Sequence, residues 1–165
     1  MRKFVRALVL VLMPLAVLTA CDKKSDAATS GSYDTSAASN ARYLADYAAR
    51  PDVKKTASGL MYRVLREGKG PSVLRGSDVV TVYYKGALIN GKVFDQTKPD
   101  EPAQFPSGSL IPGWVEALKL MKTGDTWEIV VPADLGYGPD GAGDAIPPDQ
   151  TLVFTMSLVK VEYAN

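Results

Sequence analysis

Residues 78–95 read DVVTVYYKGALINGKVFD. From Asp78 to Tyr84 the side chains are mostly β-branched or aromatic, a composition that favours extended strands. Asn90-Gly91 is the type of dipeptide that most strongly indicates a two-residue β-hairpin turn, and Phe94-Asp95 closes the hairpin. The stretch therefore predicts two antiparallel strands joined by a tight turn.

The chain on both sides of this hairpin extends the pattern. Three more strands are expected, at residues 60–65, 127–131 and 152–161, and one helix, at Trp114–Met121. In the helical stretch, apolar residues recur every three positions and Thr123-Gly124 follows as a stop signal. Strands in succession around one helix predict an α+β domain over residues 58–165, an antiparallel twisted β-sheet wrapped around one short α-helix.

The composition limits the chemistry that this domain can perform. The chain has 165 residues and a formal net charge of +1, which fits one globular domain and gives no indication of a nucleic-acid partner. It has no histidine and a single cysteine, Cys21. These counts remove Ser-His and Cys-His nucleophiles, internal disulfides and thiolate metal clusters. We therefore expect no metal and no cofactor, and a mechanism that relies on carboxylates, hydroxyls, backbone amides or shape.

The N-terminus has the pattern of an export signal. Residues 1–20 begin with three basic side chains and continue as an apolar run too short to span a bilayer comfortably. Leu18-Thr19-Ala20-Cys21 resembles the bacterial lipobox, which implies cleavage after Ala20 and acylation of Cys21. Residues 21–39 are mainly small and polar, and a flexible tether is expected there. The protein is thus expected in the cell envelope, lipid-anchored to a bacterial membrane with its domain in the periplasm, and the choice between inner and outer membrane stays open.

A short amphipathic helix and a connector are predicted over residues 40–57. The segment Asn40–Ala49 carries apolar side chains at helical spacing, Asn40 is a candidate N-cap, and Pro51 lies just past the end. The apolar face of such a helix must pack against a partner. Packing on its own domain, in a monomer, is the favoured interpretation, and a dimer through residues 40–50 is the alternative.

Two patterns in the second half are interpreted as turns. Gly136–Gly141 matches the dinucleotide-binding pattern G-x-G-x-x-G, but Pro132 interrupts the approach and later prolines forbid the helix that this pattern requires. The aspartates between residues 134 and 149 lack the spacing of a calcium loop. Asp95 is the one acid set among aromatic residues, and no second acid has a comparable setting for a glycosidase-like carboxylate pair.

The remaining signal is a set of aromatic and aliphatic residues at loops and strand ends rather than in a periodic stripe. Five stretches carry it: Val82-Tyr83-Tyr84-Lys85-Gly86, Gly91-Lys92-Val93-Phe94-Asp95, Leu110-Ile111-Pro112-Gly113-Trp114, Leu135-Gly136-Tyr137-Gly138, and Ile146-Pro147-Pro148 running into Thr151-Leu152-Val153-Phe154. In this order they resemble the FKBP-type peptidyl-prolyl isomerases, the tacrolimus-binding immunophilins, over about Gly59 to Glu162. Thr56–Tyr62 is also similar to the domain entry in the macrophage infectivity potentiator branch of bacterial envelope FKBPs.

The resemblance implies an apolar pocket that binds the proline of an X-Pro segment and accepts tacrolimus-type macrolides as inhibitors. The implied substrate-binding residues are Phe94, Leu110, Ile111, Trp114 as the floor, Ile146 and Phe154. The implied catalytic residues are Tyr84, Asp95 and Tyr137, with Asp95 orienting a tyrosine hydroxyl. Two departures from the family pattern, Ala103 in place of an aromatic and the small loop Gly141–Ala145, are expected to open the pocket on one side.

The implied activity is peptidyl-prolyl cis-trans isomerisation that assists the folding of exported proteins, without covalent or metal catalysis. Twisting an X-Pro amide needs no proton carrier, which agrees with a chain that has no histidine. Two alternatives stay open at this point. In the first, the aromatic residues belong in part to the core. In the second, the domain serves chiefly as a chaperone or adhesin, and its isomerase activity is incidental.

Overall fold

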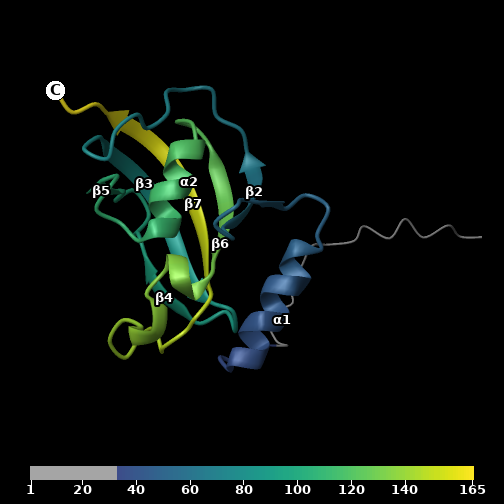
Figure 1. Cartoon of the computed structure of the whole chain (residues 1–165). Coiled ribbons are helices and arrows are strands. Elements are labelled where there is room, and N and C mark those ends of the chain that lie inside the picture. The colour runs from purple at the N-terminus through teal and green to yellow at the C-terminus, as the bar shows by residue number, and fades with distance from the viewer. Residues whose placement is uncertain (1–32) are drawn as a thin grey trace, which may run out of the picture.

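The structure, a computed structural model, describes residues 33–165 (Figure 1). The predicted signal peptide 1–20, the predicted lipidation site Cys21 and most of the predicted tether lie outside the described residues. Within residues 33–165, no helix combines the length and the apolar character needed to cross a lipid bilayer.

The described chain folds into one antiparallel sheet and two α-helices, with two short 3₁₀ helices (η) in the loops. In chain order, the elements are α1 Ala37–Ala48, β1 Lys54–Lys55, β2 Met61–Arg66, β3 Val79–Leu88, β4 Val93–Gln96, β5 Ala103–Pro106, α2 Pro112–Leu120, β6 Thr126–Val131, η1 Ala133–Leu135, η2 Gly138–Asp140 and β7 Leu152–Glu162. The strand order is β1-β2-β6-β7-β3-β4, and β5 also pairs with β3. This is the predicted α+β architecture.

The long strands β3 and β7 form the centre of the sheet. They pair along the whole of β3, whose other edge pairs with β5 through Val79–Val82 and with β4 through Lys85–Ala87. Figure 1 shows α2 lying along the sheet, in front of β7 and β3. Its buried residues Trp114 and Leu118 belong to the main core, together with inward-facing residues of β3, β6 and β7. The helix starts very close to β6, since a Cβ at Gly113 would lie 2.6 Å from a methyl group of Val131.

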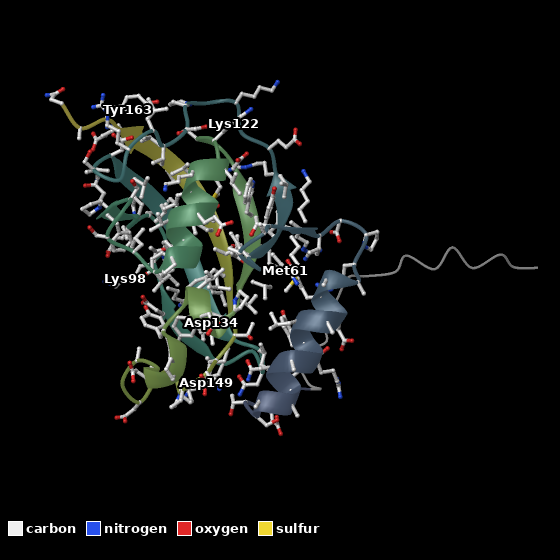
Figure 2. All side chains as sticks on the ribbon, in the orientation of Figure 1. Met61, Lys98, Lys122, Asp134, Asp149 and Tyr163 are labelled. Atoms are coloured by element: carbon white, nitrogen blue, oxygen red, sulfur yellow. The ribbon has the colours of Figure 1, made fainter. Side chains whose placement is uncertain are left out.

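The helix α1 packs on the outer face of the same sheet. Tyr47 forms a second buried cluster with Met61 of β2 and Val130 of β6, and Figure 2 places Met61 beside α1. Side chains alternate along a strand, and the neighbouring residues Tyr62 and Ile129 pack into the main core on the inner face. The helix therefore packs on its own domain, as the favoured interpretation predicts, and the oligomeric state stays a prediction.

The predicted start of this helix is wrong by three residues. The helix begins at Ala37, and the side chain of its N-cap, Ser36, accepts a hydrogen bond from the Ser39 N–H at 3.2 Å. Asn40, the predicted cap, lies inside the helix and is buried. Thr35, Ser36, Ser39 and Asn40 are all residue types that cap helices. The sequence pattern alone therefore does not show which of these four residues caps the helix.

Other differences are smaller. The domain helix begins at Pro112 rather than Trp114, because proline fits the first helical position, where no N–H is needed. The short strands β1 and β5 were not expected, and β1 lies in the segment predicted as a connector. The hairpin predicted around Asn90-Gly91 is present as β3 and β4.

Candidate functional site

A cavity of about 170 Å³ lies where the start of α2 meets the strands β3, β4, β5 and β7. It is lined by Tyr84, Phe94, Asp95, Phe105, Leu110, Ile111, Trp114, Tyr137 and Phe154. Six of these nine side chains are apolar, two are phenols and one is a carboxylate. They come from segments spread over 71 positions, from residue 84 to residue 154, so the cavity forms only when the whole domain folds.

Trp114 and Phe154 are the most deeply buried lining residues, with exposures of 4% and 3%. Their rings meet edge to face with centroids 5.2 Å apart, and Tyr84 meets Trp114 in the same way at 5.1 Å. Edge-to-face contacts are a favourable arrangement of aromatic rings. The indole N–H of Trp114 has no hydrogen-bond partner in the part of the chain that the structure describes. Ring packing, and not hydrogen bonding, therefore holds this base of the cavity.

The start of α2 determines where Trp114 lies. Pro112 is the first helical residue, and the carbonyl oxygen of Ile111 accepts the N–H groups of Trp114 at 2.9 Å and Val115 at 3.1 Å. These bonds close the first turn immediately after Ile111. Ile111 and Trp114 thus face the same cavity from the two ends of one helical turn.

Gly86 of β3 makes room for two of the rings. A Cβ at this position would lie 2.7 Å from Phe154 Cε1 and 2.7 Å from Phe94 Cζ. Real Cβ atoms do not approach neighbours so closely, so any larger residue would displace both rings. Phe94 and Phe154 themselves pack edge to face at 5.6 Å. The shape of the cavity therefore depends on glycine at position 86 as much as on the rings.

Two phenols and a carboxylate form the polar edge. Tyr84 Oη donates a hydrogen bond to Asp95 Oδ2 at 2.5 Å, as predicted. Burial, followed by this hydrogen bond, raises the pKa of Tyr84 well above its ordinary value of 10. Tyr84 therefore stays protonated at neutral pH and keeps donating to Asp95. Tyr137 lies between η1 and η2 and is 41% exposed, so its side chain is open to an entering ligand.

Eight of the nine residues predicted for substrate binding or catalysis line this cavity. The ninth, Ile146, is 4% exposed and packs within the main core instead. Phe105 lines the cavity and was not predicted. The apolar–polar–apolar order Ala103-Gln104-Phe105, which β5 presents as alternating half-buried and exposed side chains, is the local sequence signal that could have revealed it. Neither Ala103 nor residues 141–145 line the cavity.

Two other hollows are larger but have mixed linings. One, of about 290 Å³, lies beside the stacked rings of Tyr62 and Trp127, and another, of about 330 Å³, lies between α1 and the β3–β4 turn. Both include several charged side chains, and neither includes any residue of the predicted site. A mainly apolar cavity with a few convergent polar groups is the better candidate for a ligand.

The lining suits one kind of chemistry. Its apolar rings can enclose an apolar ring, and its phenols can hydrogen-bond to polar groups beside that ring. Within residues 33–165, no cluster of three or more His, Cys, Asp or Glu side chains is placed to bind a metal ion. The cavity is thus suited to bind an apolar ring that carries polar groups beside it.

Comparison with known families agrees with this arrangement. Residues 70–159 match the family model of the FKBP-type peptidyl-prolyl cis-trans isomerases, and residues 14–64 match the model of the domain amino-terminal to such isomerases. The chain is 43% identical over 140 residues to the FKBP-type 22 kDa peptidyl-prolyl cis-trans isomerase of Escherichia coli, covering 84% of this chain and 68% of that protein. It is 46% identical over 123 residues to the outer membrane protein MIP of Legionella longbeachae, covering 74% of this chain and 52% of that protein. The matched part thus spans 68% of the length of the first relative and 52% of the second.

Solved structures show the same fold. A peptidyl-prolyl cis-trans isomerase from Pseudomonas syringae superposes with a TM-score of 0.70 at 40% identity, over 75% of this chain and 91% of that one. FkpA from Escherichia coli superposes with a TM-score of 0.72 at 41% identity, over 78% of this chain and 60% of that one.

Proposed function

The chain belongs to the FKBP-type peptidyl-prolyl cis-trans isomerase family, and we propose that it rotates X-Pro peptide bonds in the cavity beside Trp114. Its substrates are X-Pro segments of exported proteins, whose folding it assists. The step requires no covalent intermediate and no metal. The observation that carries this proposal is the nine-residue lining, in which apolar rings surround a space of about 170 Å³ and phenols stand at the edge.

An apolar cavity favours the twisted amide. The planar X-Pro amide is stabilised by resonance that gives the C–N bond partial double-bond character and places charge on the oxygen. The twisted transition state has lost that resonance and is less polar. Removal of water from the carbonyl group therefore raises the free energy of the planar state more than that of the twisted state.

Binding contacts select the twisted geometry further. The proline ring packs against Trp114, between the walls of the cavity. The backbone N–H of Ile111, which has no backbone acceptor in residues 33–165, donates to one substrate carbonyl, and the Tyr137 hydroxyl donates to another. Asp95 does not transfer a proton. It accepts the Tyr84 hydroxyl and so fixes the orientation of that ring.

The required rate enhancement is within reach of these contacts. Uncatalysed isomerisation takes tens of seconds. Turnover in roughly a millisecond corresponds to an acceleration of about 10⁴, or about 5–6 kcal/mol of transition-state stabilisation. Net hydrogen-bond contributions of about 1 kcal/mol each, together with desolvation and packing of the proline ring, account for that order of magnitude.

The direct test is an isomerisation assay with the full chain in detergent. The cis-to-trans relaxation of a short X-Pro peptide should accelerate in proportion to protein concentration, and tacrolimus should abolish the acceleration. A folded preparation that leaves the relaxation at its uncatalysed rate would refute the proposal. An acceleration that persists under saturating tacrolimus would refute the assignment of the activity to this cavity.

We further propose that acylated Cys21 anchors the enzyme in the cell envelope, with the domain in the periplasm. The lipobox-like sequence that ends at Cys21 supports this location, as does the description of the Legionella longbeachae relative as an outer membrane protein. Cys21→Ser should move the protein from the membrane fraction to the soluble fraction. Mass spectrometry of the N-terminal peptide should find two or three acyl chains on Cys21 and none on the variant.

A further inference from the structure

A buried polar cluster joins the first half of α1 to the segment that precedes β7. Asn40 Oδ1 accepts the backbone N–H of Thr151 at 2.8 Å, and Asn40 Nδ2 donates to the Ser36 carbonyl oxygen at 3.0 Å and to Gln150 Oε1 at 3.4 Å. Gln150 Nε2 donates in turn to the Thr35 carbonyl oxygen at 3.1 Å and to that of Pro148 at 2.9 Å. The two side chains thus connect the helix with a segment about 110 positions away.

These side chains are almost completely removed from water. Asn40 is 6% exposed, Gln150 5% and Thr151 2%. Buried amides are tolerated where their donors and acceptors are satisfied, and both amides here have partners on both atoms. The partners also fix the orientation of the Asn40 amide, because a backbone N–H needs the oxygen and a carbonyl needs the nitrogen. Loss of one partner would leave a buried polar group unsatisfied.

The same segment supports the loop that carries Tyr137. The N–H of Asp149, next to Gln150, donates to the carbonyl oxygen of Gly138 at 2.9 Å, and Gly138 is next to Tyr137. Asp149 has a φ of +58°, a left-handed conformation that is uncommon outside glycine and that aspartate adopts more readily than most residues. Figure 2 shows Asp149 below the sheet, between the lower end of α1 and the loop of η2.

We propose that Asn40 and Gln150 are positioning residues for the isomerase reaction: by holding Asp149 and Thr151, they keep the Gly136–Gly138 turn in place and so fix the Tyr137 ring at the edge of the cavity. Neither side chain lines the cavity, so neither touches substrate. The inference rests on the proposed function, since it assigns a role to Tyr137 in that site. It makes α1 a part of the active enzyme and not only a spacer before the domain.

A double-mutant cycle tests the connection. Asn40→Ala should lower kcat/KM for an X-Pro peptide by about threefold or more, well below the unfolding temperature, and Tyr137→Phe should lower it as well. If Asn40 acts through Tyr137, adding Asn40→Ala to Tyr137→Phe should change kcat/KM by less than about 1.5-fold. A purely structural Asn40 predicts the same loss in both backgrounds, and that outcome would overturn the proposal.

Tyr47→Phe is the matched control, because it removes a hydrogen bond between the other end of α1 and Glu128. It should leave kcat/KM within about 1.5-fold of the parent protein, whereas Gln150→Ala should lower kcat/KM. If Tyr47→Phe and Gln150→Ala lowered kcat/KM equally, any weakening of the contact between α1 and the sheet would reduce activity, and the proposal would be wrong.

Amide hydrogen exchange provides a readout that does not depend on catalysis. The Asp149 N–H should exchange at least about tenfold faster in Asn40→Ala or Gln150→Ala, and at nearly the parent rate in Tyr47→Phe. If the parent protein shows no isomerase activity, the proposed function fails while this structural connection is still tested. Unchanged exchange in both variants would overturn the connection even in a fully active enzyme.

Discussion

The two faces of the sheet both carry aromatic side chains but use them differently. On the inner face, the rings of Tyr84, Trp114 and Phe154 meet edge to face around a cavity of about 170 Å³. On the outer face, Tyr47 is 1% exposed and fills the contact between α1 and the sheet, against Met61. Aromatic composition is therefore no guide to a binding site by itself. A site arises where the rings surround a space that no side chain fills.

The same contrast applies to hydrogen bonds. Each face has a tyrosine that donates to a carboxylate, Tyr84 to Asp95 at 2.5 Å on the inner face and Tyr47 to Glu128 at 3.0 Å on the outer face. Glu128 also accepts a hydrogen bond from Arg63, so the outer pair belongs to a larger hydrogen-bond and ion-pair network. The inner pair borders the cavity. We therefore expect loss of the inner tyrosine–carboxylate bond to reduce activity, and loss of the outer one to reduce only stability.

The largest effect is expected from removal of the base of the cavity. Trp114→Ala should lower the free energy of unfolding by about 3–5 kcal/mol, as is typical for deletion of a buried large aromatic side chain. Because this variant risks unfolding, Trp114→Leu is the better subject for kinetics, and its kcat/KM should fall by about tenfold or more at temperatures where it is folded. Denaturant unfolding and the peptide assay measure the two effects. Parental kcat/KM in folded Trp114→Leu would contradict the assignment of the floor.

The next effect is expected at Gly86. In Gly86→Ala the new methyl group would overlap Phe94 and Phe154, and such overpacking typically destabilises by about 1–3 kcal/mol. Displacement of these two rings should also narrow the cavity and weaken tacrolimus binding, which calorimetry can measure. Gly76→Ala is the control, because a Cβ there would meet its nearest atom at an ordinary 3.5 Å. Equal tacrolimus affinity in both variants would show that Gly86 does not shape the site.

The inner face could largely be predicted from sequence, because its strands and turn have local signals and its lining residues lie in stretches that resemble the FKBP family. The stretch 78–95 carries strand composition and a hairpin dipeptide, and the residues around Pro112 carry a helix start. Phe105 was missed because β5 has only four residues, too few to establish an alternation. Ile146 was assigned to the cavity because it lies in one of the stretches that resemble the FKBP family, but in the structure it packs within the core.

The attachment of the outer helix was harder to predict. Asn40 has the composition of a cap residue, and its actual partners, Gln150 and Thr151, lie 110 or more positions away. Nothing within the local window distinguishes a cap from a buried amide that joins two elements. Ser36 is the cap because it directly precedes the first helical residue, Ala37, whereas Asn40 lies inside the helix.

A smaller effect separates the two tyrosine–carboxylate pairs. Tyr84→Phe should lower kcat/KM by about three- to tenfold, since it removes one hydrogen bond that orients the cavity edge, and should lower stability by no more than about 1 kcal/mol. Tyr47→Phe should lower stability by about 1 kcal/mol and leave kcat/KM unchanged. Kinetics and denaturant unfolding of both variants are the measurement. If both variants lost activity alike, the functional difference between the two faces would disappear.

The smallest effect concerns titration at high pH. Burial and, to a smaller extent, the nearby Glu128 carboxylate raise the pKa of Tyr43 to about 12, whereas burial and the hydrogen bond to Asp95 raise the pKa of Tyr84. A raised phenol pKa means that the unfolded chain, with phenols near 10, releases protons before the folded chain does. The stability contributed by the neutral phenols is therefore fully present below pH ~10 and is lost as the pH rises above it.

The two carboxylates make this titration specific to each face. In phenolate absorbance titrations, Glu128→Gln should lower the pKa of Tyr43 and leave that of Tyr84 unchanged. Asp95→Asn should do the reverse. The elevation that remains in each variant should come mainly from burial, because burial is the largest cause of the raised pKa of both tyrosines. A shift of both tyrosines in either variant would mean that the carboxylates act across the sheet, and the two faces would then be one electrostatic unit rather than two.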